Sequence, residues 1–138
     1  MSGSEEVEAA IPRGTLATQT IAMPADTNPA GDIFGGWLLS QMDLAGAVVA
    51  WERASCRIAT VAVDSMTFHR PVFVGDVVSC YGDVVRVGRT SIAVRVEAWA
   101  LRRGLGERHR VTQGVFTYVA LGEDRKPRPI EDAPVTEG

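Results

Sequence analysis

The chain has 138 residues, of which 46% are hydrophobic and 22% charged, and its formal net charge is −3 at pH 7. This length suits a single domain, and the composition is that of a globular protein that can bury a core. The charge argues against nucleic acid as a partner, because phosphate binding needs clustered positive side chains and the sequence contains no long basic run.

The first half of the chain predicts an arm, a strand and a helix. Residues 1–13 are acidic and lack the basic and apolar regions of a secretory signal, so we expect a flexible arm and a cytoplasmic protein. Residues 16–23 alternate weakly and predict a short strand that ends at Pro24. Residues 36–53 predict a helix, because apolar residues fill most of its faces without a proline. Charged residues interrupt this segment, which falls short of the ~20 apolar residues of a membrane span.

The middle of the predicted helix is built from small residues, namely Ala45, Gly46, Ala47 and Ala50, which would let a sheet approach closely. We expect this helix to be wrapped by the sheet. After it, period-two patterns rich in Val, Thr and aromatic residues predict four long strands at 57–70, 76–87, 90–103 and 108–121. Their connectors, "PVFVG", "GR" and "GLGE", are short and suit antiparallel neighbours.

The last segment, 122–138, combines charge with three prolines, and we expect a flexible tail that cannot join a core. The folded domain is therefore expected at 14–121. One helix and about five antiparallel strands close a core only if the sheet curls around the helix, an α+β arrangement. Exposed edges and the uncovered sheet face predict at least a dimer.

The segment "PADTNPAGDIFGGWLLSQMD", residues 24–43, carries the polar groups most suited to chemistry. It begins like a calcium loop at Asp26, Asn28 and Gly31, but Trp37 stands where a bidentate glutamate is needed. Its glycines do not have dinucleotide-binding spacing, and no serine lies in a nucleophile elbow. Cysteines and histidines are scattered, so we expect no metal site. The two cysteines, Cys56 and Cys80, are expected to be reduced structural thiols.

What remains is a polar loop that enters a helix through Gly35 and Gly36. Free N–H groups at a helix start point toward developing negative charge, so this loop could form an oxyanion hole. Asp43 lies seven residues after Gly36, on the same side of a helix. With no basic residue three or four positions away, its carboxylate could activate water or attack directly.

Three motifs, "PADTNPAGDIFGGWLLSQMD", "VAVDSMTFHRPVFVGDVV" and "VGRTSI", resemble the hotdog-fold acyl-CoA thioesterases, most closely their short bacterial YciA type. The resemblance extends from about Thr18 to Val119. It implies a hotdog fold, in which a curled antiparallel sheet wraps one long helix. It also implies hydrolysis of acyl-CoA to a free acid and CoA without a metal or organic cofactor. The sites would lie between subunits, and members of this type commonly form trimers of dimers.

The resemblance also implies roles for individual residues. Asp43 matches the catalytic aspartate, as general base or as nucleophile. Asn28 and Asp32 match polar positions that face this carboxylate across the dimer interface, and the backbone N–H of Gly36, with or without Gly35, would hold the thioester oxygen. Thr60 matches a strand position near the helix, where it either helps to place water or is a buried structural threonine.

For CoA, the turn "VGRTS" offers Arg89, Thr90 and Ser91 as phosphate ligands, with Arg57 and Arg70 as further basic candidates. Each arginine could instead be a solvated surface charge. The chain departs from the pattern of this family at His69, where the resemblance implies an aliphatic residue.

Two alternative functions remain open. A hotdog dehydratase or hydratase would need a histidine base, for which His69 and His109 are the candidates, but neither lies in the glycine-rich segment. A non-catalytic acyl-CoA-binding module would tolerate the loss of Asp43 and Asn28, both of which are present.

Overall fold

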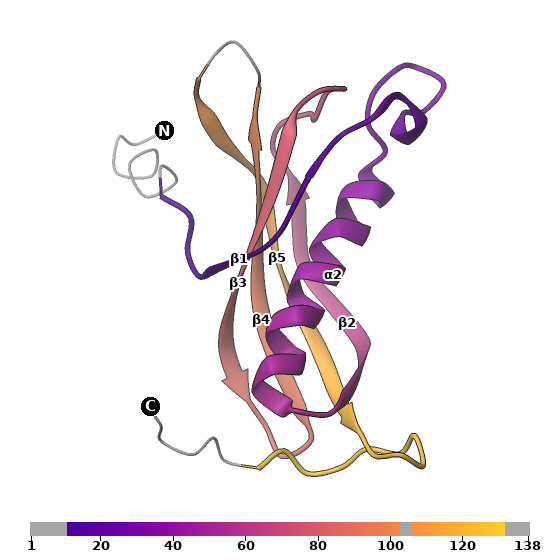
Figure 1. Ribbon diagram of the computed structural model, residues 1–138, viewed down its shortest axis with the longest axis vertical. Helices are drawn as coiled ribbons and strands as arrows, with labels where there is room; N and C mark the ends of the chain where they lie inside the picture. Colours follow the sequence, from indigo (N-terminus) through magenta and orange to yellow (C-terminus); the bar gives the residue numbers. More distant parts are fainter. Residues whose placement is uncertain (1–10, 103–105, 132–138) are drawn as a thin grey trace.

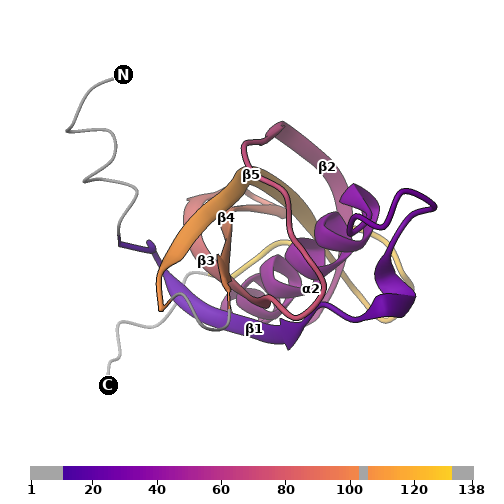
Figure 2. The same cartoon turned by 90° about the horizontal axis from the view of Figure 1, so that it is seen from above.

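The computed structural model describes residues 11–102 and 106–131. The elements are β1 (Thr15–Ile21), the 3-10 helix η1 (Pro24–Asp26), α2 (Gly35–Ala54), β2 (Arg57–Phe68), β3 (Val77–Val87), β4 (Ser91–Leu101) and β5 (Arg108–Leu121). The predicted order of one strand, one helix and four strands is confirmed. The five strands form one antiparallel sheet that curls around α2 (Figures 1 and 2). Among the described residues, no helix has both the length and the apolar character needed to cross a lipid bilayer.

The strand order β1-β3-β4-β5-β2 corrects one expectation. We expected the connector at 71–75 to join neighbouring strands, but β2 pairs with β5, and β3 pairs with β1 and β4. The connector starts beside β5, where the His69 N–H donates to the Val111 carbonyl at 2.8 Å. It ends beside β1, where Gly75 donates to Ala22 at 2.8 Å. Because the sheet curls, a short connector can cross from the β2 side to the β1 side near the start of the helix (Figure 2).

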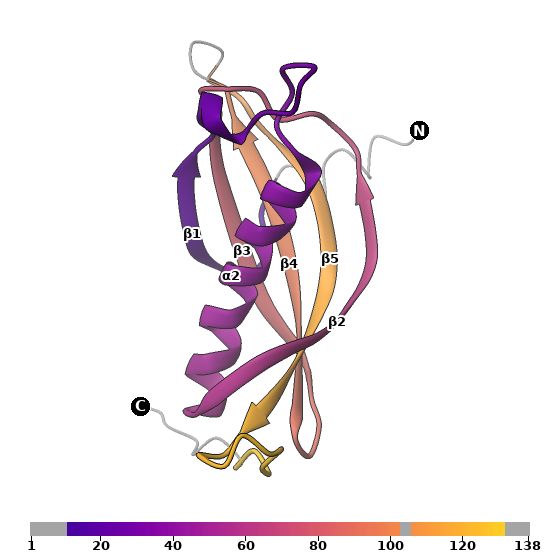
Figure 3. The ribbon, with the colours of Figure 1, turned by 90° about the vertical axis from the view of Figure 1, so that its right-hand side faces the viewer.

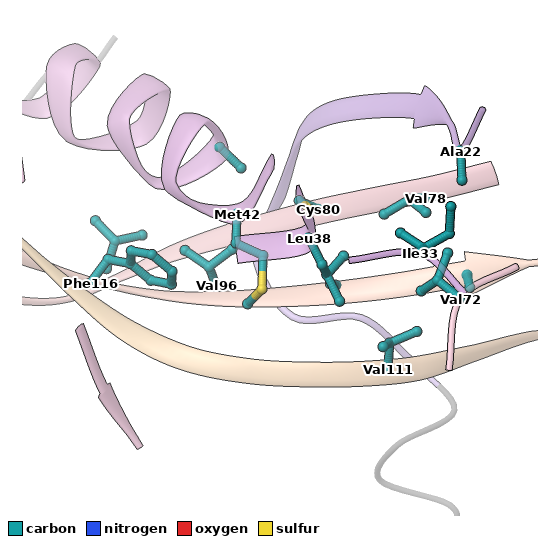
Figure 4. Close-up of a cluster of buried hydrophobic side chains, with 14 of the residues drawn as sticks. Ala22, Ile33, Leu38, Met42, Val72, Val78, Cys80, Val96, Val111 and Phe116 are labelled. Atoms are coloured by element: carbon teal, nitrogen blue, oxygen red, sulfur yellow. The ribbon is translucent and has the colours of Figure 1, made fainter. Parts of the chain in front are cut away.

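The core lies between α2 and the concave face of the sheet. From the helix, Leu38 and Met42 point toward the sheet, where Val96 and Val111 are among their neighbours in the buried cluster (Figure 4). The buried helical residues are Leu38, Met42, Ala45, Gly46 and Ala50. Their spacing of three or four residues places them along the side of the helix that meets the sheet.

The prediction that small residues admit the sheet is confirmed. A Cβ added at Gly46 would lie 2.2 Å from the hydroxyl oxygen of Tyr118 on β5, and one at Gly82 on β3 would lie 2.7 Å from Val49 of the helix. The wrapping of the helix is nevertheless incomplete. Leu44, Val48 and Trp51 remain 55%, 40% and 58% exposed along one side of α2.

The expectation that the last segment cannot join a core is wrong for residues 122–131. Arg128 donates its backbone N–H to Ala120 at 2.9 Å, and Ile130 donates to Arg89 at 2.8 Å. The side chain of Ile130 packs against the core cluster. Main-chain hydrogen bonds, which composition does not reveal, dock this charged segment beside β5 and the β3–β4 turn. The rest of the expected tail, at 132–138, and the expected arm at 1–10 lie outside the described residues.

Candidate active site

The polar loop before α2 is organised by its own side chains. The Oδ2 atom of Asp26 accepts the N–H of Met23 at 3.0 Å, and the Oδ1 atom of Asn28 accepts the N–H groups of Ala30 and Asp32, each at 3.0 Å. The side-chain oxygens of Asp26 and Asn28, two residues of the calcium-like pattern, therefore accept hydrogen bonds from backbone amides. In the described residues, no group of three or more His, Cys, Asp or Glu side chains could hold a metal ion.

Asn28 and Asp32 do not meet Asp43 of their own chain. Neither residue lines the hollow that contains Asp43, and the loop that carries them projects beyond the start of the helix (Figure 3). The two amides bound by Asn28 Oδ1 orient the carboxamide, so its NH₂ group points away from the loop backbone. The loop thus presents an amide donor and, at the exposed Asp32, a carboxylate.

The helix begins at Gly35, with Phe34 as an extended N-cap residue at φ −59° and ψ 136°. No side chain in the described part of the chain caps this end. The N–H groups of Gly35 and Gly36 belong to the first helical turn and therefore have no partner inside the helix. A Cβ added at Gly36 would meet nothing within 4 Å, whereas one at Gly35 would touch the Phe68 ring at 3.6 Å. The backbone at Gly36 is thus open to an approaching group.

Gly36 and Asp43 line the same hollow, as their seven-residue spacing predicts. This hollow has a volume of about 260 Å³, and its walls are Gly36, Leu39, Ser40, Asp43, Val63 and Phe116. The helix supplies Gly36 and the Asp43 carboxylate, while β2 and β5 supply an apolar wall. A glycine of the helix start and a carboxylate beside one hollow suit the hydrolysis of a carbonyl compound.

Asp43 is partly buried and has two hydroxyl partners, which corrects the expectation of an unpaired carboxylate. Thr60 Oγ1 donates to Asp43 Oδ1 at 2.7 Å. The Tyr118 hydroxyl lies 3.2 Å from the same Oδ1 and 2.9 Å from the main-chain oxygen of Asp43. Thr60 is exposed in this chain rather than buried. These two hydroxyls explain how an apolar helix carries a carboxylate without a basic neighbour.

Tyr118 is the site residue that the sequence analysis missed. Burial, together with the charge of Asp43 and the hydrogen bond to it, raises the pKa of the Tyr118 hydroxyl well above its ordinary value. The phenol is therefore protonated and available as a donor. A signal for it does exist in the sequence, because the alternation of β5 places Phe116, Tyr118 and Ala120 on the buried side, where a tyrosine hydroxyl needs a partner.

The structure separates the basic candidates into two groups. Arg70 lies near the helix start, in a small hollow that also contains Phe34, Gly35 and Phe68. The β3–β4 turn with Arg89, Thr90 and Ser91 lies at the opposite end of the molecule, beside the end of α2 (Figure 3). Arg57 begins β2 at that same end. The five candidates therefore do not form one cluster within a single chain.

A larger groove of about 750 Å³ runs along the exposed side of α2. Its helical wall includes Leu44, Val48 and Trp51, and its far end holds Arg57 and Arg128. The sequence analysis missed Arg128, because its backbone hydrogen bond to Ala120 places it there. Cys56 also lines this groove and Cys80 is buried, and both are free, as expected. Burial raises the pKa of the Cys80 thiol to about 11.

The two histidines lie outside the hollow that contains Asp43. His69 is exposed at the end of β2. His109 on β5 has a pKa lowered by partial burial and by the positive charges of Arg70 and Arg102. Neither histidine therefore joins the glycine amides and Asp43, as a hydratase base would need to do.

Comparisons with known proteins agree with this fold. The model of the thioesterase superfamily matches residues 30–107. The acyl-CoA thioester hydrolase YciA of Salmonella typhimurium is 52% identical over 122 residues, which cover 86% of this chain and 92% of that relative. A solved hexameric thioesterase from Yersinia pestis is 50% identical with a TM-score of 0.85, covering 88% of this chain and 100% of its own. A hexameric hotdog fold thioesterase of Campylobacter jejuni is 49% identical with a TM-score of 0.82, covering 86% and 91%.

Proposed function

The chain belongs to the thioesterase superfamily, and from that premise we propose that it hydrolyses acyl-CoA thioesters with Asp43 as its catalytic carboxylate. It is an acyl-CoA thioester hydrolase with a hotdog fold. The observation that carries the proposed mechanism is the shared hollow, which is lined by both Gly36 and Asp43. No resident metal or organic cofactor takes part in the proposal.

In this mechanism the N–H of Gly36, with or without that of Gly35, donates to the thioester oxygen. Negative charge develops on this oxygen when the carbonyl carbon is attacked, so a fixed donor stabilises the transition state more than the ground state. Asp43 either removes a proton from the attacking water or attacks the carbonyl itself to form an acyl anhydride that water then opens. In both routes the carbon–sulfur bond breaks, and CoA leaves as a thiolate that takes up a proton.

Asn28 and Asp32 are proposed to act on Asp43 of a neighbouring subunit. The support is geometric, because the loop that carries them projects away from its own Asp43 while its carboxamide donors remain oriented outward. A second copy also suits the long edge of β2, which is an end strand of the sheet. The hexameric thioesterases with the same fold make a trimer of dimers the arrangement that we propose here.

A shared site predicts subunit complementation. Asn28→Asp keeps an oxygen for the amides of Ala30 and Asp32 but removes the NH₂ donors, and Asp43→Asn removes the carboxylate, so each variant alone should be inactive. When the two are unfolded together and refolded, mixed dimers should regain one intact site. Random mixing then restores about a quarter of wild-type activity. The control is each variant refolded alone, and absence of recovery in verified mixed oligomers would show that each site comes from one chain.

For CoA we propose phosphate binding at the end of the molecule where Arg89, Thr90 and Ser91 meet Arg57 and the newly found Arg128. The groove along α2 is lined by apolar helical side chains and also by Arg57, Arg128 and the acidic Glu123. Two arginines beside one carboxylate give a positively charged lining, which suits the phosphorylated end of the substrate, and the apolar side chains suit its apolar arm. Arg70, near the helix start, would serve a neighbouring subunit's substrate or remain a surface charge.

Replacing Arg89 by alanine should raise KM about five- to tenfold and leave kcat nearly unchanged, because a phosphate contact is remote from the bond that breaks. The backbone oxygen of Arg89, which accepts the N–H of Ile130, is unaffected by the change. The matched control is Arg86→Ala, on an exposed stretch of the adjacent strand, which should leave KM unaltered. A loss of kcat at constant KM would contradict the assigned role. The wild-type KM should also rise with salt more steeply than that of the variant.

A further inference from the structure

We infer that Tyr118 is a positioning residue which, with Thr60, occupies the Oδ1 atom of Asp43 and leaves Oδ2 as the oxygen that reacts. The inference rests on the proposed function and deepens it, since it assigns the reaction to one atom. In the described part of the chain, the hydrogen bonds to the Asp43 side chain all end on Oδ1, at 2.7 Å from Thr60 and 3.2 Å from Tyr118. Thr60 donates to Oδ1, and the single proton of the Tyr118 hydroxyl is shared between Oδ1 and the main-chain oxygen of Asp43, so Oδ1 is a poorer base and nucleophile than its free neighbour.

The two hydroxyls reach the same atom because of how β2 pairs with β5. Thr60 lies directly opposite Tyr118 in the register, and Val63 lies opposite Phe116. In a regular strand, Thr60 and Val63 would point to opposite faces, because side chains alternate. The register shift between Thr60 and Ala62 changes this alternation, so that both side chains lie on the same face. Thr60 therefore reaches Asp43, and Val63 lines the hollow beside it. The bulge at Val61 thus allows one strand, β2, to contribute both Thr60 and Val63 to the site.

The helix makes room for the phenol with a glycine one turn after Asp43. A Cβ at Gly46 would lie 2.2 Å from the Tyr118 hydroxyl oxygen and 3.0 Å from the adjacent ring carbon. Because of this notch, the hydroxyl also reaches the main-chain oxygen of Asp43 at 2.9 Å. Tyr118 therefore holds both the backbone and the side chain of Asp43, which restricts the rotation of the carboxylate.

Tyr118→Phe removes the hydroxyl and keeps the ring. We expect kcat to fall about tenfold with KM within about twofold of wild type, the size of one hydrogen bond to a charged group. The matched control, Tyr81→Phe on β3, should change neither quantity.

Thr60, which is exposed, provides a second and independent test of the inference. Thr60→Val should lower kcat at nearly constant KM, as Tyr118→Phe does, and Thr60→Ser, which keeps the hydroxyl, should restore kcat. Gly46→Ala should reproduce the Tyr118→Phe phenotype by displacing the hydroxyl. In the Tyr118→Phe background the same alanine should have a much smaller effect, because the atom it approaches most closely is gone.

The outcomes separate this inference from the proposed function. If Asp43→Ala is inactive while Tyr118→Phe and Thr60→Val keep the wild-type kcat, the positioning role is refuted and the catalytic role of Asp43 stands. A fall in kcat in Thr60→Val that Thr60→Ser does not rescue, or an equal change in KM, indicates a packing role and also overturns the inference. If Asp43→Ala stays active, the catalytic role of Asp43 is refuted, and the positioning role that depends on it is refuted as well.

Discussion

Replacing Asp43 by alanine is expected to lower kcat for acyl-CoA hydrolysis by about 10²–10⁴-fold, the range for a lost general base, and at least as much for a lost nucleophile. The carboxylate is the one acidic group in the hollow with Gly36, so no other side chain there can replace it. The measurement is thiol release from acyl-CoAs of several chain lengths, with hydration of crotonyl-CoA followed in parallel to detect hydratase activity.

Asp43→Asn is the sharper form of this experiment. Asparagine has nearly the same shape and still offers an oxygen to Thr60 and Tyr118, so the fold around the helix should persist. It cannot remove a proton from water or form an anhydride. We expect it to be as inactive as the alanine variant, with an unchanged thermal unfolding midpoint. Thiol release by either variant at the wild-type rate would refute the mechanism. If the variants lost only the hydration of crotonyl-CoA, the result would favour a hydratase.

Single-turnover trapping distinguishes the two routes open to Asp43. With enzyme in excess, hydroxylamine that attacks the Asp43 carbonyl of an acyl anhydride leaves a hydroxamate on the peptide that contains this residue and releases the free acid. Attack at the other carbonyl releases an acyl hydroxamate and restores Asp43. Detection of the peptide hydroxamate by mass spectrometry supports nucleophilic attack, and the absence of both products under conditions that trap a model anhydride supports general-base catalysis.

Replacing Gly36 by proline is expected to lower kcat about 10²–10³-fold, the effect of removing one oxyanion donor. Proline lacks the backbone N–H and is tolerated in the first turn of a helix, where that N–H has no partner inside the helix. The side chain has space, since a Cβ at Gly36 meets nothing within 4 Å. The loss should appear in kcat more than in KM, because the charge on the oxygen develops only in the transition state.

Two controls accompany this variant. Gly36→Ala keeps the N–H and adds only the Cβ, so it should retain far more activity than Gly36→Pro. Gly35→Pro removes the preceding N–H at a position that follows the extended Phe34, a geometry that proline favours. A small loss of activity in Gly35→Pro would identify Gly36 as the main hydrogen-bond donor to the thioester oxygen. If Gly36→Pro and Gly36→Ala lost activity equally, bulk rather than the hydrogen bond would be the cause.

The element order, the strand positions and the juxtaposition of Gly36 with Asp43 could be predicted because each depends on local periodicity. Apolar spacing and the absence of proline indicated α2, and alternation indicated the strands. The seven-residue spacing in one helix fixes which residues share a side, whatever packs against it. The small residues around Gly46 likewise predicted a close approach of the sheet, although not which side chain would approach.

The errors all concern contacts between distant parts of the chain. The connector at 71–75 looked like a link between neighbouring strands, and the docked segment at 122–131 looked like a tail. Neither the pairing of β2 with β5 nor the hydrogen bond from Ile130 to Arg89 leaves a local pattern. Their positions depend on how the whole sheet curls.

The sequence by itself determined the helix, the strands and the presence of an amide and a carboxylate on one helical face, because bond geometry and side-chain periodicity act within a few residues. Only the tertiary structure decided what holds Asp43. Thr60 lies 17 residues from Asp43 and Tyr118 lies 75 residues away, and they meet it through a strand register, a bulge and a glycine notch. These three features exist only once the sheet has closed around the helix, because each one is a relation between elements that are far apart in the chain.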